Sequence, residues 1–301
     1  MTVGGERVAM ISVDTVLVPT DGSQGAEATI DHAIDLARTY DAAVHALYVV
    51  DPGTELADLD ADQREDLSAP SERLGREATI TITNQVEEHG LETARAVHEG
   101  IAHREILAYA DEHDVDLIAM GTHGRTGRER ARLGSTTERV ISLGDVPVLS
   151  VRLSDEEVPS AGFDRIVVPT DGSDAAERAA RRALELAQRY DAEVRVVYVV
   201  DTTIYSLEDA PGSIVGLLTE GGQTATETIA EMARERELSV RTAVRRGVPA
   251  ADLLEYAAAV DADLVTMGTR GRAAGAESDR LLGSTTARVV ARSPVPVLAV
   301  D

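Results

Sequence analysis

The chain has 301 residues, and its 53 Asp and Glu against 29 Lys and Arg give a formal net charge of -24 at pH 7. Apolar residues make up 43% of the chain, which excludes a disordered polymer and is ample for a packed core. The absence of cysteine excludes disulfides, thiolate zinc sites and cysteine nucleophiles. The acid excess argues against nucleic acid as a main partner, because affinity for phosphate backbones comes from clustered positive charge.

The sequence predicts a cytoplasmic protein. No apolar run reaches the roughly 18 residues that a membrane span needs. The first residues, MTVGGERVAMISVDT, contain an early glutamate and no long apolar stretch of the kind found in secretory signals. We therefore expect neither membrane insertion nor export.

The length suggests two domains, and the chain in fact contains one domain twice. Motifs of the first half (copy A) recur about 150 residues later in the second half (copy B). They are VPTDGS at 18–23 and 168–173, YVVD at 48–51 and 198–201, MGTHGR at 120–125 with MGTRGR at 267–272, LGSTT at 133–137 and 282–286, and PVL at 147–149 and 296–298. We expect domains at residues 1–152 and 163–301, joined by a polar linker at 153–162.

Each copy is expected to alternate strands and helices. In copy A the apolar runs predict strands at 15–19, 44–50, 93–98, 116–120 and 146–151, and helical spacing predicts helices at 26–40, 77–88, 105–112 and 136–143. Alternation implies parallel strands with right-handed crossovers, so we expect an α/β fold with one doubly wound five-stranded parallel sheet per copy. The acidic segment 52–76 is left open between a lid and a disordered loop.

Two polar segments follow strands, where open α/β sheets bind their ligands. PTDGS at 19–23 follows the first strand, and GTHG at 121–124 follows the fourth. The second segment leads to the helix that begins near Ser135, where glycines and unpaired helix amides favour an anion. A carboxylate opposite such a phosphate cradle suits a nucleotide.

A simpler interpretation of these segments is purely structural. The glycines are then turn residues, and Asp21 only caps the first helix. Ser135 and Glu138 have the spacing of a capping box, so Ser135 is then only a helix cap.

At these motifs the chain resembles a tandem universal stress protein, with two such domains covering nearly all of its length. The resemblance implies Rossmann-like domains of the adenine nucleotide alpha hydrolase type. It also implies that the last strands, 146–151 and 295–300, pair the two copies as a pseudo-dimer within one chain. The nucleotide-binding branch of the family has a glycine, two residues, a glycine, nine residues and then Gly-Ser or Gly-Thr, and copy A matches through Gly121, Gly124 and Gly134. The resemblance therefore implies ATP, with AMP or ADP as alternatives, together with Mg²⁺.

Carried over by position, the resemblance also implies the residues that contact the nucleotide. In copy A these are Asp21 and Val49 on the adenine side, Met120, Gly121 and Gly124 at the ribose and phosphates, and Gly134, Ser135 and Thr136 at phosphate oxygens. In copy B they are Asp171, Val199, Met267, Gly268, Gly271, Gly283, Ser284 and Thr285.

Copy B departs from the family pattern, because eleven residues instead of nine follow its second glycine. The altered site could bind AMP-like ligands, bind ATP weakly, or carry the insertion as an outward bulge. The bulge with competent binding is favoured, since loops tolerate insertions.

Histidines and arginines near the loop are weighed separately. All seven histidines lie in copy A without an HExxH pair and scatter over several elements, which favours surface or packing roles over a metal site. His123 is a candidate phosphate contact, and copy B has Arg270 in its place. Four loop arginines could pair with phosphates or with surface acids, namely Arg125, Arg128, Arg130 and Arg132.

The function that we expect is that of an ATP-binding, nucleotide-dependent stress-response protein with no catalytic residue assigned, an unidentified protein partner and an open oligomeric state. One alternative is a slow ATP hydrolase or phosphotransferase. No Walker motif supports it, since the chain contains no lysine, and no GxSxG elbow is present. Another alternative is a nucleotide-free dimerisation module, which the intact glycine motif of copy A disfavours.

The acid excess predicts dependence on salt. Residues 1–152 hold 28 acidic residues and 13 arginines, and residues 153–301 hold 25 and 16, so both halves are acidic. This distribution favours a solvated, halophile-like surface over a single acidic patch for a basic partner. Because salt screens the self-repulsion, we expect the thermal midpoint of unfolding to rise from low to molar salt. Equal midpoints by calorimetry at the two salt concentrations would contradict this expectation.

Overall fold

The computed structural model of the chain describes residues 12–23, 29–51, 61–123, 132–152, 162–203, 212–271 and 281–301. Each copy alternates strands and helices, as the sequence predicts. Copy A contains β1 Thr15–Thr20, α2 Ile30–Tyr40, β2 Ala43–Val50, α3 Ala61–Glu88, β3 Thr93–Glu99, α4 Ala102–Glu112, β4 Leu117–Gly121, α5 Ser135–Leu143 and β5 Val148–Val151. Copy B contains β6 Arg165–Pro169, α6 Asp174–Tyr190, β7 Glu193–Asp201, α7 Gly212–Arg234, β8 Val240–Gly247, α8 Pro249–Ala259, β9 Leu264–Gly268, α9 Ser284–Arg292 and β10 Val297–Val300.

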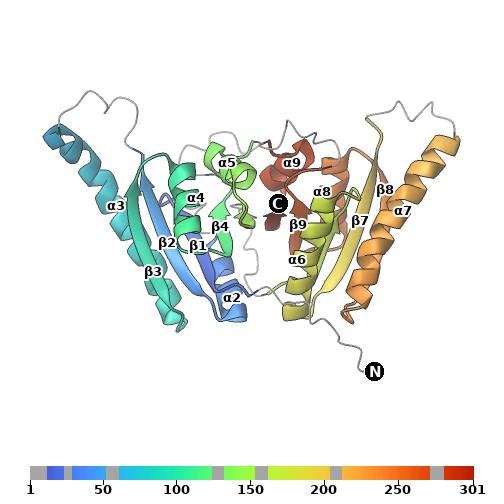
Figure 1. The fold of residues 1–301 in the computed structure, drawn as a ribbon, viewed down its shortest axis with the longest axis horizontal. Helices are drawn as coiled ribbons and strands as arrows, with labels where there is room; N and C mark the ends of the chain where they lie inside the picture. Colours follow the sequence, from blue (N-terminus) through green and yellow to red (C-terminus); the bar gives the residue numbers. More distant parts are fainter. Residues whose placement is uncertain are drawn as a thin grey trace, which may run out of the picture.

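One sheet of ten strands runs through both copies (Figure 1). Its order is β3-β2-β1-β4-β5-β10-β9-β6-β7-β8, and the strands are parallel within each copy. The copies join where β5 pairs antiparallel with β10, with Leu149 opposite Leu298. This confirms the expected pseudo-dimer. The strands of the two copies therefore run in opposite directions at this seam.

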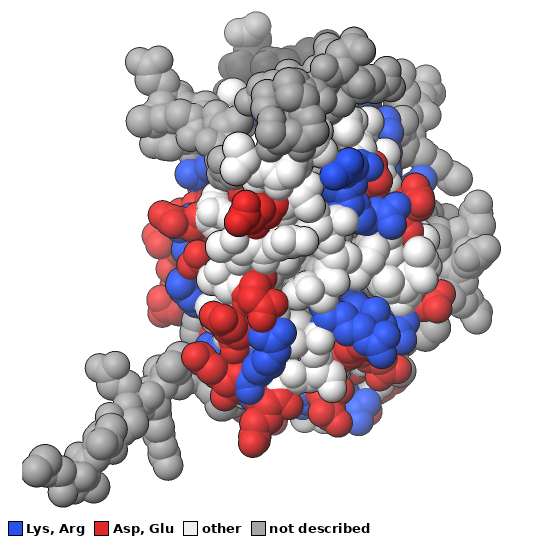
Figure 2. Space-filling view, turned by 90° about the vertical axis from the view of Figure 1, so that its right-hand side faces the viewer, with Lys and Arg blue, Asp and Glu red and all other residues white. Residues whose placement is uncertain are grey.

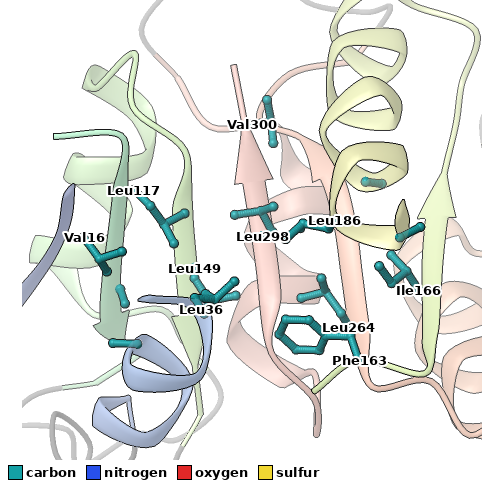
Figure 3. Packing of buried hydrophobic residues seen from close by; sticks show 14 of the residues in the cluster. Val16, Leu36, Leu117, Leu149, Phe163, Ile166, Leu186, Leu264, Leu298 and Val300 are labelled. Carbon is teal, nitrogen blue, oxygen red and sulfur yellow. The ribbon is translucent and has the colours of Figure 1, made fainter. Parts of the chain in front are cut away.

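A continuous apolar core crosses the seam between the copies (Figure 3). Leu149 and Leu298 are buried there with Leu36 of α2, Leu186 of α6 and Phe163. Burying a side chain of this size stabilises a fold by about 1.5–3 kcal/mol. A second cluster lies on the other face of the sheet, beneath α4, α5, α8 and α9. Both faces of the sheet are therefore covered, which explains why the strands are apolar without alternation.

The structure settles part of the open question about the acidic segment 52–76. Helix α3 begins at Ala61 and continues through Pro70, so residues 61–76 are helical and do not form a disordered loop. Residues 52–60 lie outside the described part of the chain. The apolar pattern marks only the half of α3 that buries Ile82 and Val86, and an internal proline is typical of a helix end. Figure 1 shows α3 and α7 rising at the outer ends of the sheet.

Acidic and basic side chains are interspersed on the face that carries α7 and β8 (Figure 2). Ion pairs connect some of them, including Arg241 to Glu193 at 2.9 Å and Arg245 to Glu255 at 3.0 Å. Such partly exposed pairs contribute little to stability. None of the helices in the described ranges has both the length and the apolar character that crossing a membrane requires.

In each copy a tyrosine of the second outermost strand packs against a glycine of the outer helix, α3 or α7. In copy A the ring of Tyr48 in β2 packs on α3 at Gly75, where a Cβ would lie 2.5 Å from a ring carbon. In copy B Tyr198 packs on Gly222 in the same way, with a distance of 2.6 Å. The missing side chain lets each helix approach the strand closely.

We expect Gly75→Ala to destabilise the protein by about 1–3 kcal/mol, because the new methyl group overpacks the Tyr48 ring. Gly216→Ala is the matched control in α7, where a Cβ meets nothing within 4 Å. It should stabilise the protein by about 0.5–1 kcal/mol through helix propensity. Urea unfolding of the two variants and the unmodified chain measures both effects. A Gly75→Ala protein as stable as Gly216→Ala would contradict this packing.

Candidate functional site

A pocket of about 840 Å³, partly open to solvent, lies at the carboxyl ends of β1, β2 and β4 in copy A. This volume includes open solvent at the mouth of the pocket. It is lined by Pro19, Thr20, Asp21, Leu47, Val49, Ala102, Ile106, Met120, Gly121, His123, Gly134, Ser135, Thr136 and Thr137.

One wall of the pocket is a tight turn at the end of β1. Gly22 has a φ of 71°, a conformation that favours glycine, and its N–H donates to Thr20 Oγ1 at 3.0 Å. Asp21 Oδ1 accepts a hydrogen bond from the Ser23 N–H at 3.0 Å. The turn therefore holds the Asp21 carboxylate at the strand end, against the pocket.

The same turn recurs in copy B, where the helix cap is a serine and not the aspartate. Asp171 Oδ1 accepts from the Ser173 N–H at 3.0 Å, and Ser173 Oγ in turn accepts from the Ala176 N–H at 3.2 Å as the N-cap of α6. In copy A residues 24–28 lie outside the described part of the chain, so the alternative that Asp21 caps the first helix is not tested there.

Two hydrogen bonds join the end of β4 to the start of α5, and we call this pair the strand–helix clasp. The Gly134 N–H donates to the Thr122 carbonyl at 2.9 Å, and Thr137 Oγ1 donates to the Gly121 carbonyl at 2.8 Å. The chain leaves the end of β4 after Thr122 and is bonded back to it at Gly134. The clasp therefore fixes the first turn of α5 beside the carboxyl end of the strand.

Copy B has the same clasp. The Gly283 N–H donates to the Thr269 carbonyl at 2.9 Å, and Thr286 Oγ1 donates to the Gly268 carbonyl at 2.8 Å. The two extra residues of copy B thus leave the ends of its loop in place. The loop interiors, residues 124–131 and 272–280, lie outside the described part of the chain, so neither the position of Gly124 nor the bulge is tested.

Gly134 is the N-cap of α5, and no side chain caps the helix there. A Cβ on Gly134 would lie 2.9 Å from the Thr122 carbonyl oxygen, so only glycine fits the clasp. Ser135 is the first helical residue and is exposed, which makes the capping-box interpretation with Glu138 wrong. The first-turn amides of α5 carry the partial positive charge of a helix N-terminus at the pocket.

The floor of the pocket is apolar. Val49 and Leu47 come from β2, Met120 comes from β4, and Ile106 of α4 covers them. Met120 and Ile106 are buried. An apolar floor with polar groups beside it suits a ligand that has a flat apolar part and a charged end.

The structure brings most of the predicted residues of copy A together. Seven of them line one pocket, namely Asp21, Val49, Met120, Gly121, Gly134, Ser135 and Thr136. The sequence analysis missed other lining residues, including Ala102 and Ile106, because nothing in a helical apolar pattern shows which pocket a helix covers. The sequence did contain a sign that Thr137 matters, since the same threonine recurs in copy B as Thr286.

The predicted residues of copy B occupy equivalent elements. Met267 and Gly268 end β9, Val199 lies in β7, and Ser284 and Thr285 begin α9 after Gly283. Gly271 lies close to Asp171, since a Cβ on Gly271 would be 2.8 Å from Asp171 Oδ2. The carboxylate and the glycine loop therefore also meet in copy B.

Three histidines from different elements, His45 of β2, His98 of β3 and His113 after α4, surround the ring of Tyr109. His45 Nδ1 lies 3.1 Å from the Tyr109 hydroxyl, the His113 ring is 5.7 Å from the His45 ring, and His98 Nδ1 lies 3.3 Å from Glu105 Oε2. Burial lowers the pKa of His45, and the nearby His113 lowers it further. Sequence spacing could not show this grouping, because it depends on the register of β2 against β3 and on the helix α4 above them. Within the described ranges, no three His, Cys, Asp or Glu side chains could hold a metal ion together.

The structure describes one of the four loop arginines. Arg132 is exposed, and its carbonyl contacts His123 Nε2. The other three, Arg125, Arg128 and Arg130, lie outside the described residues.

Comparison with known proteins identifies a family. The sequence model of the universal stress protein family matches residues 12–152 and again residues 162–301. A universal stress protein of Methanocaldococcus jannaschii is 42% identical over 142 residues, which cover 47% of this chain and 84% of that protein. A universal stress protein of Mycolicibacterium smegmatis is 26% identical over 298 residues, which cover 95% of this chain and 96% of that protein.

A solved structure has the same architecture. The crystal structure of a universal stress protein from Archaeoglobus fulgidus superposes with a TM-score of 0.73 at 24% identity. It covers 96% of this chain and 97% of that chain. At this identity the likeness shows the fold alone.

Proposed function

The chain belongs to the universal stress protein family, and from that premise we propose that copy A binds ATP together with Mg²⁺ and that the nucleotide state regulates the protein's contacts in a stress response. AMP and ADP are the alternative ligands. Copy B is proposed as a second, altered nucleotide site. The proposal places the protein in the cytoplasm, where ATP is available.

The observation that carries the proposal is the set of groups that line one pocket of copy A. The lining combines the carboxylate of Asp21, an apolar floor and the helix N-terminus at Gly134 and Ser135. Adenine would pack on Val49 and Met120, and Asp21 would accept a hydrogen bond from the base or the ribose. The phosphates would accept hydrogen bonds from the first-turn amides of α5.

The fit at the phosphate end rests on the absence of a side chain. A Cβ on Gly134 would lie 2.9 Å from the Thr122 carbonyl oxygen, so only glycine fits at this N-cap, and no side chain caps the first-turn amides there. Ser135 and Thr136, exposed and half-buried, carry hydroxyl groups beside the same amides. The residues present therefore suit a phosphate group.

Nearby positive groups must offset the negative charge of the nucleotide, because a protein of net charge -24 repels a polyanion at long range. The helix amides supply part of the balance. Mg²⁺ would supply more, bound mainly through the phosphate oxygens as is usual for nucleotide sites. Since the chain contains no lysine, any charged side chain on the phosphates must be arginine or protonated histidine.

The described lining supports binding more than hydrolysis. Asp21 and His123 are its ionisable side chains. His123 Nδ1 lies 3.0 Å from Thr122 Oγ1, and its Nε2 contacts the Arg132 carbonyl. Both ring nitrogens thus link parts of the loop, which is a structural role and not that of a general base aimed at a water molecule.

The proposal is tested by calorimetry with Mg²⁺-ATP on the unmodified chain, Asp21→Ala and Asp111→Ala. Asp21→Ala should weaken binding at copy A by about 10- to 100-fold, because a hydrogen bond to a charged group is lost. Asp111→Ala removes an exposed carboxylate of α4 outside the pocket lining and should bind as the unmodified chain does. Native mass spectrometry of the purified protein should show bound adenine nucleotide.

No measurable ATP affinity in the unmodified chain would refute the proposal. Equal affinities for Asp21→Ala and Asp111→Ala would remove Asp21 from the site. Multiple-turnover ATP consumption that Asp21→Ala abolishes would favour the hydrolase alternative.

A further inference from the structure

The phosphate ends of the two copies differ in their charged side chains. In copy B, Arg270 stands where copy A has His123. Arg270 Nη2 pairs with Asp301 Oδ2 at 3.0 Å, and Thr269 Oγ1 donates to Asp301 Oδ1 at 2.8 Å. Both carboxylate oxygens are therefore engaged, and Arg270 is held toward the end of β10.

The corresponding residue of copy A is not an aspartate. The residue that follows β5 there is Arg152, and its Nη1 donates to the Arg292 carbonyl at 3.2 Å. Thr122 Oγ1, the counterpart of Thr269 Oγ1, lies 3.0 Å from His123 Nδ1. The equivalent position thus carries an arginine in copy A and an aspartate in copy B.

The side chain of Asp301 bonds to residues that lie next to the start of α9. The Thr269 carbonyl accepts the Gly283 N–H at 2.9 Å, and the Arg270 Cα would lie 3.7 Å from a Cβ on Gly283. The two residues that Asp301 binds are therefore the two that abut the helix N-terminus. Arg178 of α6 also reaches Asp301, but its Nε donates to the main-chain oxygen at 2.9 Å and not to the side-chain carboxylate.

We propose that Asp301 is a specificity-determining residue that makes copy B favour nucleotides with few phosphates, whereas copy A takes the triphosphate. Asp301 holds Arg270 in an ion pair and adds a negative charge beside the α9 N-terminus. The cost of that charge grows with each phosphate, so it is largest for ATP, smaller for AMP and absent for adenosine. This inference rests on the proposed nucleotide binding of copy B.

The pair is only partly screened by solvent, since the exposed fractions of the two side chains are 27% for Arg270 and 22% for Asp301. A charge at such a partly buried place influences a nearby ligand more than a fully exposed charge does. Asn at position 301 keeps an oxygen that can accept from Thr269 Oγ1 but removes the charge. Asp301→Asn therefore separates the electrostatic role of Asp301 from its role in holding the loop.

The test measures adenosine, AMP and Mg²⁺-ATP binding by calorimetry in the full chain, with copy A disabled by Gly134→Val. In this background copy B should bind ATP no more tightly than AMP. Adding Asp301→Asn should raise the affinity for ATP by about fivefold, raise that for AMP less and leave adenosine unchanged. The matched control is Asp191→Asn, which removes an exposed carboxylate at the C-cap of α6, where the φ of 54° suits asparagine. It should change none of the three affinities.

Equal changes for all three ligands on Asp301→Asn would overturn the inference, because they would indicate a purely structural role. So would a copy B that prefers ATP over AMP as strongly as copy A does. If copy B binds none of the three ligands in either background, both the inference and the copy B site fail. ATP binding by copy A in the unmodified chain still tests the proposed function separately.

Discussion

The candidate site depends on the strand–helix clasp, in which Gly134 and Thr137 bond back to the carbonyls of Thr122 and Gly121. The clasp holds the end of the buried strand β4 and the start of α5 together, and we call this junction the corner. It leaves the amides of the first helical turn facing the pocket, since no side chain caps them. Binding of an anion there requires little rearrangement, because the backbone is already held by the fold.

The clasp also explains how the two copies can share an architecture and differ in ligand. Its bonds have the same lengths in copy B, although the loop between them is two residues longer. The difference in ligand preference that we propose for the two copies then has its origin outside the clasp. In our proposal that origin is the aspartate that follows β10, where copy A has the arginine that follows β5. The antiparallel seam relates the two corners, each built from the end of a strand and the start of α5 or α9.

Much of the fold could be predicted because duplication and apolar runs are direct signals in a sequence. The repeated VPTDGS and LGSTT motifs marked both copies, and strand ends located most of the pocket. Other features depend on three-dimensional packing. The charged half of α3 carries no apolar pattern, and the capping-box spacing of Ser135 and Glu138 did not reveal that Gly134 occupies the cap. The grouping of His45, His98 and His113 depends on strand register and on the placement of α4, which neighbouring residues along the chain do not encode.

The central claim is that the first-turn amides of α5 hold the phosphates of a bound nucleotide. Hydrogen exchange with mass spectrometry tests it directly, because these amides have no partner within the helix and exchange rapidly until a ligand bonds to them. At saturating Mg²⁺-ATP, the account predicts slower exchange in peptides covering residues 132–138, together with those that end β1 and β4. Nucleotide binding detected by calorimetry with unchanged exchange in residues 132–138 would contradict the account.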